Sequence, residues 1–158
     1  STWRYLASGS APSASWKGVG FNDSSWPSGA GALGFRTIQT TAIPSTTGRI
    51  TYYFRTAVTI PNGSALLDAT VDLKVDDGAV VYVNGVEVIR RNLPAGAITS
   101  TTKAVTNVGV SAVGTVRTYA IPPSALTIGS NVISVEVHQY TAGSSADLLW
   151  DGQLRITR

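Results

Sequence analysis

The chain has 158 residues, with 12 Lys and Arg side chains against 9 Asp and Glu. Charged residues make up only 13% of it, about half the usual share, whereas Val, Thr and Ile supply 46 residues. This length fits one domain with a core, residues 1–158. The absence of Cys excludes disulfides, thiolate metal sites and a Cys nucleophile, and no apolar run reaches the roughly 18 residues of a membrane helix.

The first 45 residues differ from the rest of the chain. They contain Trp3, Trp16 and Trp26 amid many Gly, Ser and Pro residues. Three indole rings would leave a large apolar area in water if this stretch were disordered. We therefore expect an irregular, packed segment that wraps the remainder of the domain and contributes one edge, with these Trp side chains used for packing.

The following residues form short β-branched and aromatic runs separated by turn signals. This spacing is typical of an all-β sandwich, and no longer helical periodicity interrupts it. The predicted strands are 49–60, 71–75, 79–83, 86–90, 115–121, 131–139 and 148–156.

Two turns stand out between these strands. Asn84-Gly85 separates AVVYV from VEVIR and predicts a type I′ hairpin, because that turn needs positive φ at both central residues. Asp77-Gly78 turns the chain into residues 79–83. Asp76 and Asp77 are candidate binding residues, but Asp also caps tight turns by bonding its own backbone two residues on.

Strand alternation predicts a polar sheet face. Within residues 71–76 the acids and Lys74 point away from the apolar side chains, and within 131–139 Ser134, Glu136 and His138 do so. In YYFR, Tyr53 and Arg55 share one side. If these strands belong to one sheet, its outer face combines acids, a His, a Tyr and an Arg, a mixture suited to sugar hydroxyls and a pyranose ring. The alternative is a solvated face with cross-strand charge pairs.

The loop ends form a second candidate surface. Arg90 and Asn92 end one hairpin strand, while Gln139, Tyr140 and Asp147 flank a Gly/Ser-rich loop. We expect the Tyr140 ring to be exposed. His138 and Gln139 could instead form a structural hydrogen-bond pair that closes this loop. Trp150 is expected in the core more readily than on a binding surface.

Several motifs in order resemble a known superfamily. They are FNDSSW (21–26), LGF (33–35), YYFR (52–55), DDGAVVYVNG (76–85), EVIRRNLPAG (87–96), GSNVISVEVHQ (129–139) and SSADLLWD (144–151). Together they look like a β-sandwich module of the galactose-binding-like superfamily. They are similar to the jelly-roll sugar-binding domain of β-galactosidases and β-glucuronidases, and to carbohydrate-binding modules of secreted bacterial enzymes. The resemblance implies an antiparallel jelly roll, and some members bind carbohydrate while others only brace a neighbouring domain.

Catalysis is poorly supported by the residues. His138 is the only His, Glu87 and Glu136 are the only Glu residues, and no nucleophile elbow, HExxH or phosphate loop occurs. No cofactor is required. The resemblance allows a structural Ca²⁺ where the loop of Asn22, Asp23 and Ser24 meets the last strands near Asp151, although these residues supply too few oxygens to identify a ligand set.

The pI is near 9.4, but it reflects an excess of only three positive charges. Among the basic residues only Arg90 and Arg91 are adjacent in sequence, so there is no basic run and no nucleic-acid partner is expected. The chain begins with Ser, which favours a piece of a longer precursor, and its composition favours a secreted or surface-displayed protein. We predict a non-catalytic carbohydrate-binding accessory module, linked to other domains and without membrane contact. The alternative is a structural or adhesion module, for example of a surface layer or phage tail, with a protein partner. An enzyme is the third hypothesis.

Overall fold

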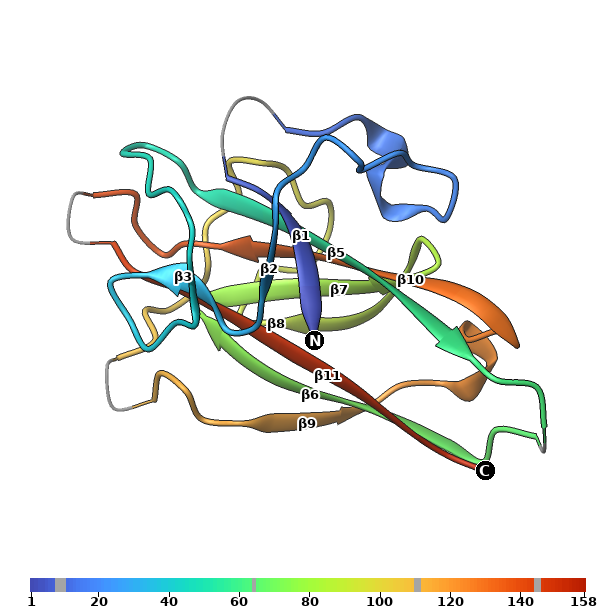
Figure 1. Cartoon of the computed structure of the whole chain (residues 1–158). Coiled ribbons are helices and arrows are strands. Elements are labelled where there is room, and N and C mark those ends of the chain that lie inside the picture. The colour runs from blue at the N-terminus through green and yellow to red at the C-terminus, as the bar shows by residue number, and fades with distance from the viewer. Residues whose placement is uncertain (8–10, 64, 110–111, 144–145) are drawn as a thin grey trace.

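Two β-sheets face each other in the computed structural model, which describes residues 1–7, 11–63, 65–109, 112–143 and 146–158 (Figure 1). Sheet A has the strand order β2 (Ser28–Ala30), β1 (Thr2–Leu6), β5 (Thr51–Ile60), β10 (Gly129–His138), β7 (Gly78–Val83), β8 (Val86–Arg91). Sheet B has the order β4 (Thr41–Ala42), β3 (Leu33–Phe35), β11 (Leu148–Thr157), β6 (Asp68–Asp76), β9 (Arg117–Ala120). The predicted all-β sandwich is confirmed.

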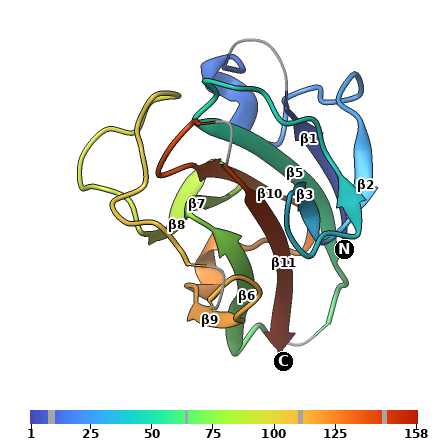
Figure 2. The ribbon, with the colours of Figure 1, turned by 90° about the vertical axis from the view of Figure 1, so that its left-hand side faces the viewer.

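The chain alternates between the sheets after β5, as in a jelly roll. β6, β9 and β11 belong to sheet B, and the strands between them return to sheet A. Figure 2 shows β11 and β6 side by side, with residues 92–107 projecting beyond the strands. All strand pairs are antiparallel except β3 with β4. Helical structure in the described residues consists of two 3₁₀ turns, Ala14–Lys17 and Pro123–Ala125, so nothing there could span a membrane as a helix.

The core lies between the inner faces of the sheets. β6 contributes Val71, Leu73 and Val75, and the corresponding alternate residues of β10 meet them from sheet A. Trp3 and Trp150 are in edge-to-face contact, with ring centroids 5.1 Å apart. The expected packing role of Trp3 and core position of Trp150 are therefore confirmed.

A second apolar cluster covers the outer face of sheet A. Trp16 and Trp26 of the N-terminal segment pack with Tyr53, Val80 and Tyr82, which alternate with core residues along β5 and β7. Trp16 meets the Tyr53 ring edge-on at a centroid distance of 5.0 Å. The segment does wrap the sandwich as predicted. It supplies edges to both sheets rather than one, because β1 and β2 join sheet A while β3 and β4 join sheet B.

Arg55 fastens this N-terminal segment to sheet A. Its side chain is only 3% exposed and its Nε donates to Asp23 at 2.8 Å. The remaining guanidinium nitrogens donate to the carbonyl oxygens of Trp16 and Gly18 and to the Ser134 hydroxyl. A buried guanidinium is costly unless its donors are all paired, so the segment and the sheet hold each other in place.

The predicted common polar face is only partly correct. In sheet A, Tyr53 lies opposite Glu136 and Arg55 lies opposite Ser134, so residues 52–55 and 131–139 do share a face. Residues 71–76 are the exception, because β6 pairs with β11 and β9 in sheet B. Alternation determines which side chains share a face of their own strand, but it does not determine which strands pair.

The Asn84-Gly85 hairpin is confirmed. Val83 pairs with Val86, and the two turn residues have φ of 52° and 89°. The Asp76–Gly78 turn has a different role, since it carries the chain from β6 in sheet B to β7 in sheet A.

Asp76 is buried at this crossing. Neither of its carboxyl oxygens receives a hydrogen bond from the described residues. Burial, together with the neighbouring carboxyls of Asp77 and Asp147, raises the pKa of Asp76 to about 9. The carboxyl is therefore protonated at neutral pH in the folded protein.

We expect Arg55→Ala to lower the free energy of unfolding by about 3–5 kcal/mol, because it removes one partner of a buried, hydrogen-bonded ion pair. Urea unfolding measures this. The control is Glu87→Gln, which breaks the more exposed Glu87–Arg90 pair and should cost less than about 1 kcal/mol. Equal losses in the two variants would contradict the anchoring role of Arg55.

Asp76→Asn should make the protein more stable at alkaline pH. In the wild type the folded state keeps a proton, with a pKa of about 9, that the unfolded chain releases near pH 4. The free energy of unfolding therefore falls as pH rises between these values. Asn stays neutral at every pH. The free energy of unfolding of the variant should therefore exceed that of the wild type by on the order of a few kcal/mol at pH 8.5 and by little at pH 4.5.

Urea unfolding of both proteins at the two pH values measures this difference. Asp68→Asn, at an exposed position of the same strand, serves as the control and should show no such pH-dependent gain. If Asp76→Asn raised the free energy of unfolding equally at both pH values, the stability of the protein would not be linked to protonation of Asp76.

Candidate functional site

The outer face of sheet A holds three of the predicted site residues, and the structure encloses them. Tyr53, Arg55 and His138 are 3%, 2% and 0% exposed. His138 Nδ1 lies 2.6 Å from the Thr102 carbonyl oxygen, so this nitrogen donates, and Nε2 lies 3.3 Å from Glu136. His138 is thus held by Thr102 and Thr51, and the hydrogen-bond pair with Gln139 that the sequence suggested as an alternative does not form between these side chains.

The loop-end residues are also engaged in holding loops. Arg90 pairs with Glu87 and donates to the carbonyl oxygens of Pro94 and Gly96. Gln139 is buried and donates to the Asp147 carbonyl oxygen at 2.7 Å. These contacts fix the backbone rather than present free polar groups to a ligand.

Asp77 brings several loop ends together. Its carboxylate accepts hydrogen bonds from the backbone N–H groups of Val108 and Tyr140, each at 2.7 Å. Its carbonyl oxygen accepts from the Asn92 side chain at 3.2 Å. The Tyr140 ring is 45% exposed, as expected, and Asp147 lines a separate pocket of about 210 Å³ beside Arg36. Ser144 and Ser145, between Tyr140 and Asp147, lie outside the described residues.

The loop considered for calcium does not fit a metal. Both carboxylate oxygens of Asp23 face guanidinium groups, that of Arg4 at 3.3 Å and that of Arg55 at 2.8 Å. Asn22 Oδ1 accepts the Ser24 N–H. The two guanidinium groups already neutralise the Asp23 carboxylate, whose negative charge a bound cation would need. Across the described ranges, no group of three or more His, Asp or Glu side chains is arranged to hold a metal ion.

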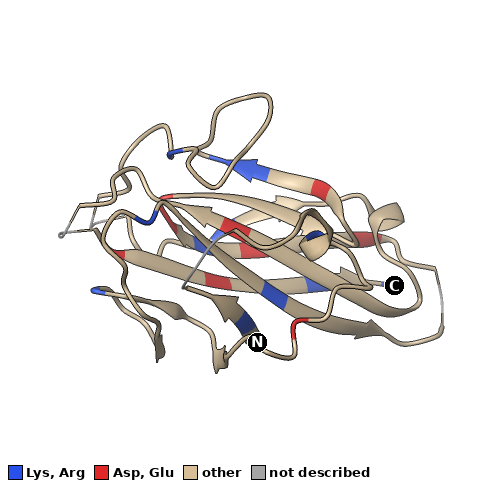
Figure 3. Ribbon diagram, turned by 90° about the horizontal axis from the view of Figure 1, so that it is seen from above, with Lys and Arg blue, Asp and Glu red and all other residues tan. Residues whose placement is uncertain are grey.

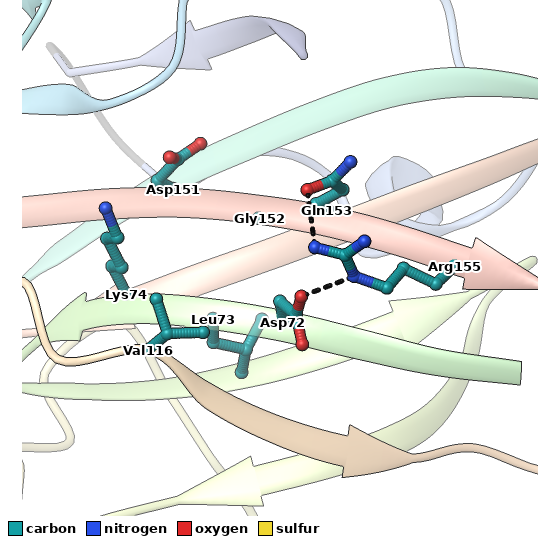
Figure 4. A pocket seen from close by; sticks show the side chains of 8 residues that line it. All are labelled: Asp72, Leu73, Lys74, Val116, Asp151, Gly152, Gln153 and Arg155. Atoms are coloured by element: carbon teal, nitrogen blue, oxygen red, sulfur yellow. Dashed lines mark hydrogen bonds and ion pairs between the residues drawn. The ribbon is translucent and has the colours of Figure 1, made fainter.

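The outer face of sheet B carries several charged and polar side chains around one cavity of about 220 Å³ (Figure 4). We call it the β6–β11 pocket. Its polar lining comes from two paired strands and its apolar wall from Val116, which is 52% exposed. The lining residues are Asp72, Leu73, Lys74, Val116, Asp151, Gly152, Gln153 and Arg155.

Strand pairing explains how these side chains meet. Lys74 of β6 lies opposite Asp151 of β11, and Asp72 lies opposite Gln153. Because side chains two residues apart on a strand share a face, Arg155 joins the same row. Acidic and basic residues are interspersed along the ribbon in the same way, without a block of one sign (Figure 3).

One end of the pocket is pre-organised by an ion pair. Arg155 Nε donates to Asp72 at 2.6 Å, and a second guanidinium nitrogen donates to Gln153 Oε1 at 3.3 Å. The Thr118 hydroxyl also donates to Asp72. The hydrogen bonds from Thr118 and Arg155 hold the pKa of Asp72 below its usual value. Asp72 is thus an ionised acceptor and is unsuited to act as a general acid.

The other end offers uncommitted polar groups. Lys74 and Asp151 make no hydrogen bond or ion pair with any residue that the structure describes, although they are register partners. Figure 4 shows Lys74 next to Val116 and Asp151 across β11 from them, both at the end of the pocket away from Arg155. These groups can donate to and accept from a bound molecule without losing a protein partner.

Gln153 and Arg155 were not among the site residues predicted from the sequence. The alternation of Asp151, Gln153 and Arg155 along the last strand was a usable signal, since all three lie on one face. Nothing in the sequence showed that this face would meet Asp72 and Lys74.

Neither a family model nor a curated protein matches the chain. Several solved structures match its fold. A β-glucuronidase from glycoside hydrolase family 2 aligns with 87% of the chain at 18% identity and a TM-score of 0.57. A glycosyl hydrolase family 2 member from Bacteroides cellulosilyticus DSM 14838 aligns with 99% at 14% identity and a TM-score of 0.57. The β-glucuronidase of Bacteroides uniformis aligns with 94% at 18% identity and a TM-score of 0.52.

The chain spans only 13%, 20% and 16% of the lengths of these three enzymes. At such low identity the likeness concerns the fold and not the activity. The β-sandwich fold that the resemblance implied is thus confirmed, and the chain is similar in fold to one part of these much larger enzymes.

Proposed function

We propose that the chain is a non-catalytic carbohydrate-binding module of a larger, secreted or surface-displayed protein, with the β6–β11 pocket as its sugar site. The observation that carries this proposal is the set of free and pre-organised polar groups in one small cavity. Asp151 and Lys74 are unpaired, and Asp72, Arg155 and Gln153 form a fixed group beside them.

This polar set suits a sugar because each hydroxyl both donates and accepts a hydrogen bond. Carboxylates at Asp72 and Asp151 accept, Lys74 donates, and Gln153 can do both. The cavity of about 220 Å³ is smaller than the roughly 300–1,000 Å³ typical of drug-sized ligands, which favours a single sugar unit. The likeness to parts of glycoside hydrolases supports the same class of ligand.

The pocket differs from the aromatic platform predicted from the sequence. None of the described residues lining it is aromatic, and Val116 supplies the apolar contact instead. We therefore expect a weak interaction, in the micromolar to millimolar range, that gains strength only when several copies act together.

The experiment is affinity electrophoresis of the chain in gels that contain soluble polysaccharides, neutral and acidic. Asp151→Ala should weaken retention on the bound glycan at least tenfold, or about 1.4 kcal/mol, because it removes a free acceptor. Asp68→Ala, an exposed carboxylate on the same sheet, should leave retention unchanged.

Tyr140→Ala is the competing variant, since it removes the exposed ring at the loop end. Loss of retention in Tyr140→Ala but not in Asp151→Ala would reject the β6–β11 pocket as the sugar site. Absence of retention on every glycan would reject the carbohydrate-binding function and favour a structural or adhesion module.

A further inference from the structure

Tyr53 is a buried residue whose hydroxyl makes no use of the fold's own hydrogen-bonding groups. The residue is 3% exposed, yet its phenolic oxygen makes no hydrogen bond with the described residues. Burial, with a smaller contribution from Glu136, raises the pKa of this phenol to about 12, so it remains a neutral donor. The enclosed side-chain atoms without a partner do not include this oxygen, so the hydroxyl opens onto the cavities that Tyr53 lines.

The neighbouring tyrosines show the usual arrangement. The Tyr82 hydroxyl donates to Glu136 at 2.5 Å, and the Tyr52 hydroxyl accepts the Thr46 N–H at 3.3 Å. Tyr53 has no such contact among the described residues. Its hydroxyl is therefore available to a group that does not belong to the described part of the chain.

Tyr53 lines two adjoining cavities on the outer face of sheet A. One, of about 310 Å³, extends past Arg49 and Thr101, and the other, of about 190 Å³, extends past Trp16 and Glu136. Both also include Ala11 and Ser100, so the two cavities meet at Tyr53. We call these two adjoining cavities together the Tyr53 groove.

The chemistry of the Tyr53 groove favours a neutral, hydroxyl-rich ligand. Six of its lining residues are Thr or Ser, and its acid, Glu136, already accepts the hydrogen bond of Tyr82. The Lys17 ammonium rests over the Tyr82 ring at 4.1 Å from the ring centre. An extended peptide would need a free strand edge, but β5 is paired on both sides, with β1 and β10.

We propose that the Tyr53 groove is a second saccharide site, which takes a neutral oligosaccharide whose hydroxyl accepts the hydrogen bond of Tyr53. This inference rests on the proposed carbohydrate-binding function. It adds a site on the opposite sheet from the β6–β11 pocket. A chain with two such sites binds a polysaccharide bivalently, or joins two polysaccharide chains.

The decisive variant is Tyr53→Phe, which removes only the hydroxyl. Because that hydroxyl has no protein partner, the urea midpoint should not fall, whereas a structural role would lower it. Tyr52→Phe is the matched control: it removes the adjacent hydroxyl, which does have a protein partner, and faces the core. Tyr52→Phe should lower the urea midpoint and leave binding unchanged.

Binding is measured by titrating neutral cello-, xylo- and galacto-oligosaccharides into protein carrying ¹³C-labelled tyrosine. For the oligosaccharide that binds, we expect the Tyr53 ring signals to shift and the wild type to show two sites. Tyr53→Phe should weaken one site at least tenfold, and Asp151→Ala should weaken the other.

The outcomes separate the two proposals. Binding that Asp151→Ala removes and Tyr53→Phe leaves unchanged would overturn the second site and keep the first. Binding lost in Tyr53→Phe alone would support the Tyr53 groove and reject the β6–β11 pocket. If no neutral oligosaccharide binds while an acidic glycan is retained through Asp151, the groove proposal fails and the carbohydrate-binding function stands.

Discussion

The buried guanidinium of Arg55 is the contact on which the arrangement of this molecule depends. It joins strand β5 to three points of the N-terminal segment, at Asp23 and at the carbonyl oxygens of Trp16 and Gly18. The aromatic cluster of Trp16, Trp26 and Tyr82 packs on the same face. Ionic and apolar contacts therefore cooperate, because each aromatic ring that excludes water also strengthens the hydrogen bonds beneath it.

This cover makes the two outer faces of the sandwich different. On sheet A, two cavities of about 310 and 190 Å³ lie between the N-terminal segment and the loops of the described chain, and Tyr53 lines both. On sheet B, paired polar side chains of β6 and β11 stay accessible around a single cavity. The outer faces of the two sheets can therefore bind different ligands. The core that the sheets share holds these two faces at a fixed distance and orientation.

Much of the fold was predictable from local patterns. The strands follow from alternation and β-branched residues, and the Asn84-Gly85 turn follows from its need for positive φ. The site was harder to predict. Tyr53 and Arg55 were assigned to an outer polar face correctly, but the cover by Trp16 is a tertiary contact about 40 residues away in sequence that no periodicity reveals. Likewise, the pairing of β6 with β11 joins residues 72 and 153, and this brings together the polar lining of the β6–β11 pocket.

The position of β11 has a consequence for how the protein is made. This last strand lies inside sheet B, between β3 and β6, and pairs Trp150 with Leu33 and with Val75. β6 pairs with β9 on one side, but its other edge stays open until β11 has been made. Sheet A also lacks β10 until late, so most pairing is long-range and the two sheets close only after residues 129–157 have been made. A nascent chain stalled before residue 148 would thus be a substrate for chaperones rather than a partly working module.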